Sequence, residues 1–441
     1  MLGFCCLLPA IYYYLNGKTW LAVYLLFFLM TAGFQMIPVR LMTMPSMGIS
    51  KVYDWVLLFA AAIFFIRPQI FAALQVWKHV KLLIIYGSFL IVALVYSIFV
   101  ADIEVPVAVR VFRNFIFFIS LFLFLPLSLR DLEKIWKLVI YTSSMAAVIY
   151  CTQPFTHIGL LNMVISDLAS MAYNPVRFYN VPVFICPVVF FLFFPPHTFK
   201  IRFRNVLLGI NLLAVALTQH RNLVITVLLC FFLFLVMNKR LRLGNAIVYG
   251  ILACGILIAA DDFMDKRLSK GIEDIGKVSL ARQAAQFHSV ALSDLSTTEF
   301  RKLLFMERLR YVWKDETKVF FGIGLITDDS KKAKRLRFYI GAPDDDGNIS
   351  QVANIDIAWA GLLLQLGIVG TGLFLLLHVI LFSKFFSQRH DPYMQTGILY
   401  LVSLFVTSIY GSVIAMPYSM CMIMLFVAYY LKITYGRYQA E

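Results

Sequence analysis

Apolar runs about as long as a lipid bilayer is thick recur along the chain, and they constrain its fold more than any other feature. The run LLIIYGSFLIVALVYSIFV at residues 82–100 is one example. A helix needs about 20 mostly apolar residues to cross the hydrocarbon core. In addition, 61% of the 441 residues are hydrophobic and only 14% are charged, whereas about a quarter of a soluble domain is charged. The sequence therefore predicts an all-α polytopic integral membrane protein.

The apolar runs predict about twelve or thirteen transmembrane helices. The start MLGFCCLLPAIYYYL lacks the basic residues and the small-residue cleavage site of a signal peptide, so we interpret it as a membrane segment. Whether residues 2–15 cross the membrane stays open. The candidate spans are residues 2–15, 19–37, 53–66, 82–100, 109–127, 134–151, 179–196, 204–219, 221–237, 243–260, 357–383, 394–413 and 415–434.

Lysine and arginine residues gather in alternate short loops between these spans. Cytoplasmic loops of membrane proteins carry an excess of these residues. The rule therefore places the richer loops and the C-terminus in the cytoplasm, and it places the long segment 261–353 on the outer side. The richer loops contain Arg67, Lys78 and Lys81; Arg130, Lys134 and Lys137; Lys200, Arg202 and Arg204; Lys239, Arg240 and Arg242; and Lys384 and Arg389.

This topology divides the chain into N-terminal membrane helices (1–260), a partly helical periplasmic loop (261–353) and C-terminal membrane helices (354–441). The formal net charge of +15 is then largely a topology signal, so no nucleic-acid partner is expected. The seven cysteines show no CxxC pair or metal-ligand spacing, and we interpret them as packing residues. No metal site and no cofactor is predicted.

The run 205–238 is apolar except for TQHRN at residues 218–222. Because it is too long for one helix, we predict two antiparallel helices within 204–238, with TQHRN as an outward tip. Each arm has about 15 residues, or roughly 22 Å, less than the ~30 Å of the hydrocarbon core. Arg221 would then lie below the membrane surface, where an arginine indicates a functional site. Alternatively, Arg221 snorkels to the headgroups, and His220 is a tip residue satisfied by hydrogen bonds.

Further arginines lie at the outer ends of predicted helices. In MAYNPVRFYNVPVF, Arg177 precedes a membrane helix and stands between turn signals at Asn174-Pro175 and Asn180. It either binds a phosphate or anchors the chain at the membrane interface. In AVRVFRNFIFFI, Arg110 and Arg113 share one helix face. They either line the same cavity as Arg177 or contact lipid headgroups.

Within the outer segment, TEFRKLLFMERLRYVWKD has apolar residues at helical spacing, which predicts an amphipathic helix. Arg301 and Arg308 share one face of it, whereas Arg310 points elsewhere. The following KVFFGIG contains a Gly-x-Gly turn, which alone is weak evidence for phosphate binding. Asp344–Asp346 form either an exposed turn or a divalent-cation site.

The stretch NIDIAWAGLLLQLGIVGTGLFLLL returns the chain to the membrane. Asp356 at its start either caps the helix or acts as a general base. Gly367 and Gly370 allow a close helix approach or a bend.

Three features together resemble the O-antigen polymerase/ligase family of bacterial envelope glycan transferases. The first is the hairpin tip TQHRN, which is similar to that family's Ser-Arg tip. The second is the outer stretch ERLRYVWKDETKVFFGIG. The third is the re-entry NIDIAWAGLLLQLGIVGTGLF, with a polar residue before a Leu-rich, Gly-x-x-Gly helix. The resemblance covers residues 174–383.

The resemblance implies a multi-pass protein of the bacterial inner membrane that acts at the periplasmic face on glycans linked to undecaprenyl diphosphate. Arg221 and one of Arg308 and Arg310 would hold the diphosphate leaving group, because guanidinium groups bind phosphate oxygens bidentately. The expected partners are the carrier-linked glycan, membrane lipid, a glycan or lipid acceptor and, as an open question, other polysaccharide-assembly proteins. Further substrate-binding candidates are Arg177, His220, Arg301 and Arg113.

Ligases of this family present a histidine at the re-entry, where this chain has Asn354 and Asp356. The difference favours a polymerase, in which Asp356 would deprotonate an acceptor hydroxyl. A ligase that transfers glycan to lipid A core or to protein stays an alternative, as does a transporter of lipid-linked sugars. The internal repeats typical of transporters are not evident, and the polar residues concentrate at one face.

Overall fold

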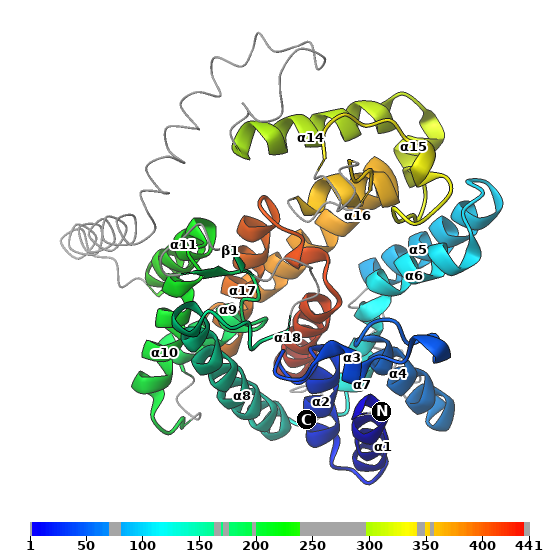
Figure 1. Cartoon of the computed structure of the whole chain (residues 1–441). Helices are drawn as coiled ribbons and strands as arrows, with labels where there is room; N and C mark the ends of the chain where they lie inside the picture. The colour runs from blue at the N-terminus through cyan, green and yellow to red at the C-terminus, as the bar shows by residue number, and fades with distance from the viewer. Residues whose placement is uncertain are drawn as a thin grey trace.

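The computed structural model shows a predominantly helical chain (Figure 1). It describes residues 2–69, 81–162, 169–170, 176–195, 200–238, 297–341, 349–352 and 357–435. A helix overlaps each predicted span within these ranges, and the span 243–260 lies outside them.

The N-terminal helices precede the outer segment. They are α1 (Leu2–Leu15), α2 (Thr19–Met30), α3 (Val39–Met42), α4 (Asp54–Ile66), α5 (Lys81–Phe99), α6 (Val105–Phe115), α7 (Ser120–Phe124), α8 (Leu129–Thr156), α9 (Ile185–Phe193), α10 (Arg204–Leu217) and α11 (Arg221–Met237), with 3-10 turns η1 (Pro45–Met47) and η3 (Ile116–Ile119).

The later elements are α14 (Thr297–Trp313), α15 (Glu316–Phe321), η6 (Ala333–Arg335), α16 (Ala358–Ser387), α17 (Pro392–Ser408), η7 (Val413–Ala415) and α18 (Pro417–Tyr435). The strands β1 (Ala169–Ser170) and β2 (Arg177–Phe178) form one short antiparallel pair.

Five helical segments in the described residues are long and apolar enough to cross a membrane. The fold is therefore that of a helical, multi-pass membrane protein. The five are Lys81–Phe99, Val105–Phe124, Leu129–Thr156, Ala358–Ser387 and Pro417–Tyr435; shorter apolar helices are Leu2–Leu15, Thr19–Met30, Asp54–Ile66, Arg204–Leu217 and Arg221–Met237.

Local sequence explains where two of the longer helices begin. At α8, the Ser128 side chain accepts from the Asp131 amide while the Asp131 carboxylate accepts from the Ser128 amide, which is a capping box. At α17, Asp391 accepts from the amides of Tyr393 and Met394, and Pro392 occupies the first turn, where its missing N–H costs nothing. These caps fix the helix starts.

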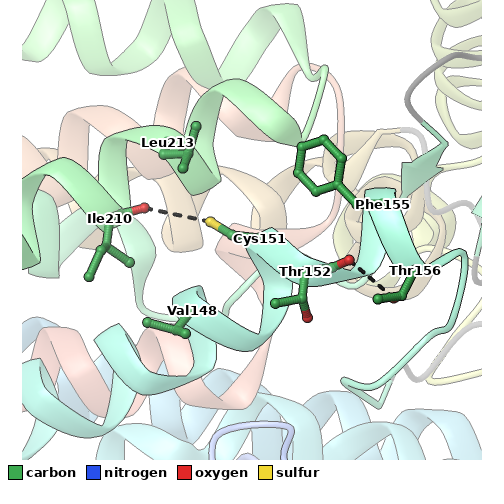
Figure 2. A pocket seen from close by; sticks show the side chains of 7 residues that line it. All are labelled: Val148, Cys151, Thr152, Phe155, Thr156, Ile210 and Leu213. Atoms are coloured by element: carbon green, nitrogen blue, oxygen red, sulfur yellow. Dashed lines mark hydrogen bonds between the residues drawn. The ribbon is translucent and has the colours of Figure 1, made fainter.

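The helix α10 packs along α8 and α9, whereas α11 packs along α17. Cys151 of α8 points towards the carbonyl oxygen of Ile210 on α10, with the sulfur 3.8 Å away (Figure 2). The arms of the predicted hairpin therefore have different main neighbours, although the chain reverses between them as expected.

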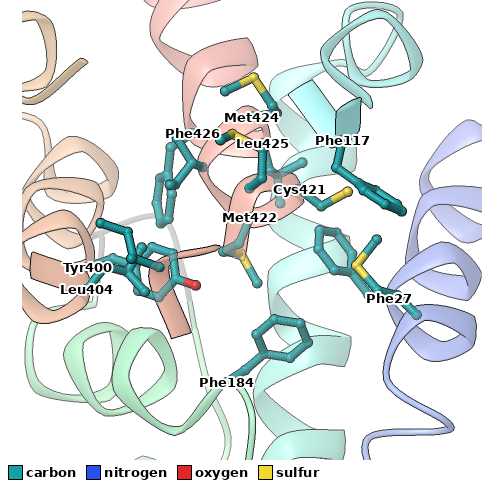
Figure 3. Packing of buried hydrophobic residues seen from close by; sticks show 14 of the residues in the cluster. Phe27, Phe117, Phe184, Tyr400, Leu404, Cys421, Met422, Met424, Leu425 and Phe426 are labelled. Carbon is teal, nitrogen blue, oxygen red and sulfur yellow. The ribbon is translucent and has the colours of Figure 1, made fainter. Parts of the chain in front are cut away.

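The helix α18 lies at the centre of the packing. About two thirds of its apolar window is buried, compared with 28% for α5, and a helix that is apolar all round belongs inside a bundle. Figure 3 shows Met422 and Phe426 of α18 among side chains from other elements, including Phe27 of α2 and Tyr400 of α17. The face of α5 left uncovered fits contact with lipid.

A break at Gly367 divides α16, because this residue has φ 71° and ψ −174°. The helices α14 and α15 both pack on α16, and in Figure 1 they lie across its upper end, away from the marked chain ends. The prediction that Gly367 allows a bend is confirmed. Gly370 provides the expected close approach, since a Cβ there would lie 2.4 Å from the Phe89 ring of α5.

Candidate functional site

The tip between α10 and α11 is enclosed by protein. Thr218 and Gln219 are buried, and Gln219 adopts a left-handed backbone with φ 51°. The Thr218 hydroxyl oxygen accepts from the amide of His220 at 3.1 Å, which stabilises the reversal. His220 and Arg221 are half-buried, and Arg221 is the first residue of α11 rather than part of the loop. The sequence therefore predicted the position of the break between the helices correctly, but the predicted tip at 218–222 includes the first two residues of α11.

Arg177 and His220, both predicted from the sequence, meet at this tip. Nη2 of Arg177 lies 2.9 Å from Nδ1 of His220, and the Arg177 guanidinium carbon lies 4.6 Å from the centre of the Tyr179 ring. The Tyr179 ring also contacts the His220 ring edge to face, with centroids 6.0 Å apart. Because a guanidinium only donates, the histidine nitrogen that faces it carries a lone pair. We call Arg177, Tyr179, His220 and Arg221 the tip cluster.

Buried polar contacts on α8 hold Arg177 in place. The hydroxyl of Tyr150 donates to the carbonyl oxygen of Phe178 at 2.8 Å. Close by, Gln153 and Asn180 exchange two side-chain hydrogen bonds of 3.1 and 3.0 Å and are both buried. Asn180 therefore shapes this approach, as its turn pattern indicated, while Asn174-Pro175 lies outside the described residues.

The pairing of α11 with α17 sets the position of Arg221. The Cys230 thiol donates to the Leu399 carbonyl oxygen at 3.4 Å, and Asn238 accepts from Gln395 at 3.0 Å. Since a later residue of α11 meets an earlier residue of α17, the helices are antiparallel. The start of α11 therefore points to the end of α17 at Ser408.

Two further segments reach that end of α17. Trp359 donates its indole N–H to the Ser408 hydroxyl at 3.0 Å, and the amide of Ala358 donates to the Gly411 carbonyl oxygen at 3.2 Å. The Arg301 guanidinium carbon lies 5.1 Å from the centre of the Tyr410 ring. We call residues 408–411 the α17 junction. The starts of α11 and α16 and the first turns of α14 are thus at the same end of the bundle.

Arg308 and Arg310 occupy different environments on α14. Arg308 is 1% exposed, forms an ion pair with Glu307, and has its guanidinium carbon 4.3 Å from the centre of the Phe338 ring. Burial lowers the pKa of Arg308 to about 10, although the carboxylates of Glu307 and Asp328 oppose the shift. Arg308 thus stays charged at neutral pH. Arg310 is exposed, which agrees with its predicted separate direction.

Arg113 and Arg110 have carboxylate partners. Nη1 of Arg113 lies 2.8 Å from Asp54 Oδ1, and its Nη2 donates to the Ser50 hydroxyl at 2.8 Å. Nη1 of Arg110 lies 2.9 Å from Asp329 Oδ2 in an exposed pair. Arg113 therefore joins α6 to the start of α4, and Arg110 joins α6 to the outer segment.

The Gly-x-Gly turn after α15 is a packing site in this structure. The amide of Ile323 donates to the Leu364 carbonyl oxygen at 2.7 Å, and the amide of Leu325 donates to the Ser97 hydroxyl at 2.8 Å. Asp328 then accepts from the amides of Gln351 and Val352 at 2.8 and 2.9 Å. The turn connects α15 with α16 and α5, and Asp328 fixes the chain just before the re-entry.

Sequence reasoning missed three residues here, namely Tyr179, Tyr410 and Asp328. Tyr179 follows Arg177 by two residues, so the sequence alone shows that they are neighbours. The contacts of the Tyr179 ring with Arg177 and His220, however, depend on the fold. Asp356, Asn354 and Asp344–Asp346 lie outside the described residues. Among the residues that the structure does describe, no group of three His, Cys, Asp or Glu side chains is arranged to hold a metal ion.

The tip cluster concentrates positive charge at the N-terminus of a 17-residue helix, whose dipole also favours anions. Its arginines provide planar donors suited to phosphate oxygens. No protein-family model matches the chain, and no curated protein is similar to it in sequence.

Proposed function

We propose that this protein is a membrane glycosyltransferase that joins oligosaccharide repeats carried on undecaprenyl diphosphate. The observation that supports this most is the meeting of cation-bearing segments at one end of the bundle. Arg177 contacts His220, the residue before Arg221. Arg301 stacks on Tyr410 in the α17 junction, and the start of α11 points to this junction. An anionic lipid headgroup needs such cations at a helix end, close to the membrane.

The sequence motifs support the same reading. The tip TQHRN, the outer arginine-rich helix and the glycine-containing re-entry resemble the O-antigen polymerase/ligase family, and the tip and the start of α16 lie at the end described above. The full proposal includes about twelve or thirteen transmembrane helices. It places the tip at the periplasmic face of a bacterial inner membrane, following the loop charges.

In the proposed reaction, an acceptor sugar hydroxyl attacks the anomeric carbon of the carrier-linked glycan. A new carbon–oxygen bond forms there, and the bond from that carbon to the diphosphate oxygen breaks. The bonding electron pair leaves with the undecaprenyl diphosphate, whose growing negative charge Arg221 and Arg177 stabilise. The hydroxyl proton passes to a base, and Asp356 is the candidate from the sequence.

The roles within α14 follow from burial. Arg308 is enclosed with Glu307, so we assign it to holding the outer segment together. Arg301, half-buried at the α17 junction, is the better candidate for contact with the diphosphate. Arg310 is exposed, so we assign it to contact with the glycan rather than with the diphosphate.

The test compares Arg221→Ala with wild type in the source cells, with membrane protein levels measured in parallel. Surface polysaccharide that collapses to a single repeat on its normal acceptor supports a polymerase. Loss of attached glycan, with long chains on the carrier, supports a ligase instead. Full-length surface polysaccharide at equal protein level contradicts the role of Arg221.

A further inference from the structure

An open, apolar groove of about 420 Å³ lies between α8 and α10 (Figure 2). Val148, Cys151 and Phe155 line it from α8, and Ile210 and Leu213 line it from α10. The threonine hydroxyls of this stretch bond to backbone carbonyl oxygens of α8 itself. The groove therefore offers a hydrocarbon surface with few polar atoms to satisfy.

The rim of the groove is exposed at the surface of the bundle. Phe155 is 68% exposed and Leu213 is 52% exposed. The helix α8 is long and apolar enough to cross a membrane, and α10 is a shorter apolar helix. In the proposed membrane arrangement, the exposed apolar side chains of the groove therefore face lipid. A hydrocarbon chain in the bilayer can enter such a groove sideways without leaving an apolar surrounding.

The groove adjoins the tip cluster. On α8, Tyr150 holds Phe178 next to Arg177, and the next residue, Cys151, lines the groove. On α10, Leu213 is about one helical turn before Leu217, where the helix ends at the tip. The groove is thus apolar and lies about one helical turn from the tip cluster with its two arginines. This arrangement matches a lipid with an anionic head and a long apolar tail.

We propose that the α8–α10 groove binds the isoprenoid chain of the polyprenyl diphosphate carrier, next to its diphosphate. This inference rests on the proposed function, because the diphosphate headgroup is that of the proposed substrate. Pockets for drug-sized ligands measure about 300–1,000 Å³, so this groove holds only the first part of a long chain. The remainder stays in the bilayer. Charge complementarity favours a diphosphate head over a phospholipid, whose single phosphate carries less charge.

The binding test uses geranylgeranyl diphosphate with a diazirine in its chain, added to the full-length protein in nanodiscs. Illumination is expected to label peptides around residues 148–156 and 210–213, and unlabelled undecaprenyl diphosphate should compete. A phosphatidylglycerol analogue with the same diazirine is the second arm. Equal labelling of these peptides by the phospholipid, or isoprenoid labelling elsewhere, overturns the inference.

The matched variants are Leu213→Trp, which fills the groove, and Val206→Trp, which changes another exposed residue of α10 outside it. Leu213→Trp should weaken labelling and raise the KM for the carrier about tenfold, because excluding roughly two methylene groups has that effect. Val206→Trp should change neither. Equal thermal unfolding of the two variants controls for folding.

These outcomes separate the two proposals. If Leu213→Trp labels like wild type while Arg221→Ala abolishes glycan extension, the groove assignment falls and the proposed function stands. If labelling maps to the groove but the protein extends no glycan, the proposed function falls and the groove remains an isoprenoid diphosphate site.

Discussion

Two arginines of α14 separated by one residue have opposite surroundings. The carboxylate of Glu307 that pairs with Arg308 also accepts from the amides of Tyr339 and Ile340. Arg308 is therefore part of a buried network that ties α14 to the 338–340 stretch. Arg310 is exposed on the same helix. At the residue scale, burial separates a structural arginine from one that can meet a substrate.

We predict that Arg308→Ala destabilises the protein and that Arg310→Ala does not. Removing Arg308 leaves the Glu307 carboxylate without its cation, which costs about 3 kcal/mol or more for a buried pair, whereas exposed changes stay within about 0.5 kcal/mol. Thermal unfolding in detergent measures both variants. Because the pKa of Arg308 is about 10, the difference should persist across neutral pH. Equal stability of the two variants would contradict this account.

The sequence predicted that Arg221 lies where two apolar helices meet, because charge inside an apolar run is informative by itself. It did not predict that Arg177 contacts His220, since 43 residues separate them. Nor did it show that Arg308 is buried, because its guanidinium packs on the ring of Phe338, about 30 residues away. Such contacts depend on tertiary packing and leave no local pattern.

At the scale of elements, α15 docks into the break of α16 through two glycines. Gly322 has φ 63°, and a Cβ there would lie 2.1 Å from the Leu364 carbonyl oxygen. At Gly367, with φ 71°, a Cβ would lie 2.6 Å from the Gly322 amide nitrogen. The backbones of the two segments touch directly. The sequence predicted a bend at Gly367, but it did not predict that Gly322 packs against this bend.

Gly367→Ala should therefore disturb this joint, and Gly372→Ala on the same helix should not. The left-handed conformation alone costs an alanine about 1–3 kcal/mol, and the clash with backbone adds to it. A Cβ at Gly372 meets nothing within 4 Å, so alanine there is expected to be neutral or stabilising by about 0.5–1 kcal/mol. Thermal unfolding and hydrogen exchange of residues 316–325 report the effect. If residues 316–325 of Gly367→Ala kept the wild-type protection from hydrogen exchange, the proposed contact between α15 and α16 would be contradicted.

At the scale of the molecule, hydrogen bonds and an ion pair attach residues 329–332 to α6 and to the turn that precedes it. Asp329 pairs with Arg110, Glu104 accepts from the amide of Lys331, and Lys332 donates to the Ala101 carbonyl oxygen at 2.9 Å. In the part that the structure describes, residues 322–337 are therefore attached to the α5–α6 turn.

The proposed orientation predicts which residues meet water on each side of the membrane. In a cysteine-free background, Asp329→Cys should react with a membrane-impermeant maleimide in spheroplasts, because its side chain is exposed on the outer segment. Arg202→Cys, just before α10, should react only after the membrane is opened. The reverse pattern would place the tip cluster in the cytoplasm.

The central claim is tested most directly by turnover with purified components. Wild type and Arg221→Ala are placed in nanodiscs with undecaprenyl-diphosphate-linked oligosaccharide extracted from the source cells, and product length is measured by mass spectrometry. We predict that wild type lengthens the glycan by whole repeats and releases undecaprenyl diphosphate, and that Arg221→Ala does neither. Equal lengthening by the variant would contradict the role of Arg221, and no lengthening or release by wild type would contradict the polymerase itself.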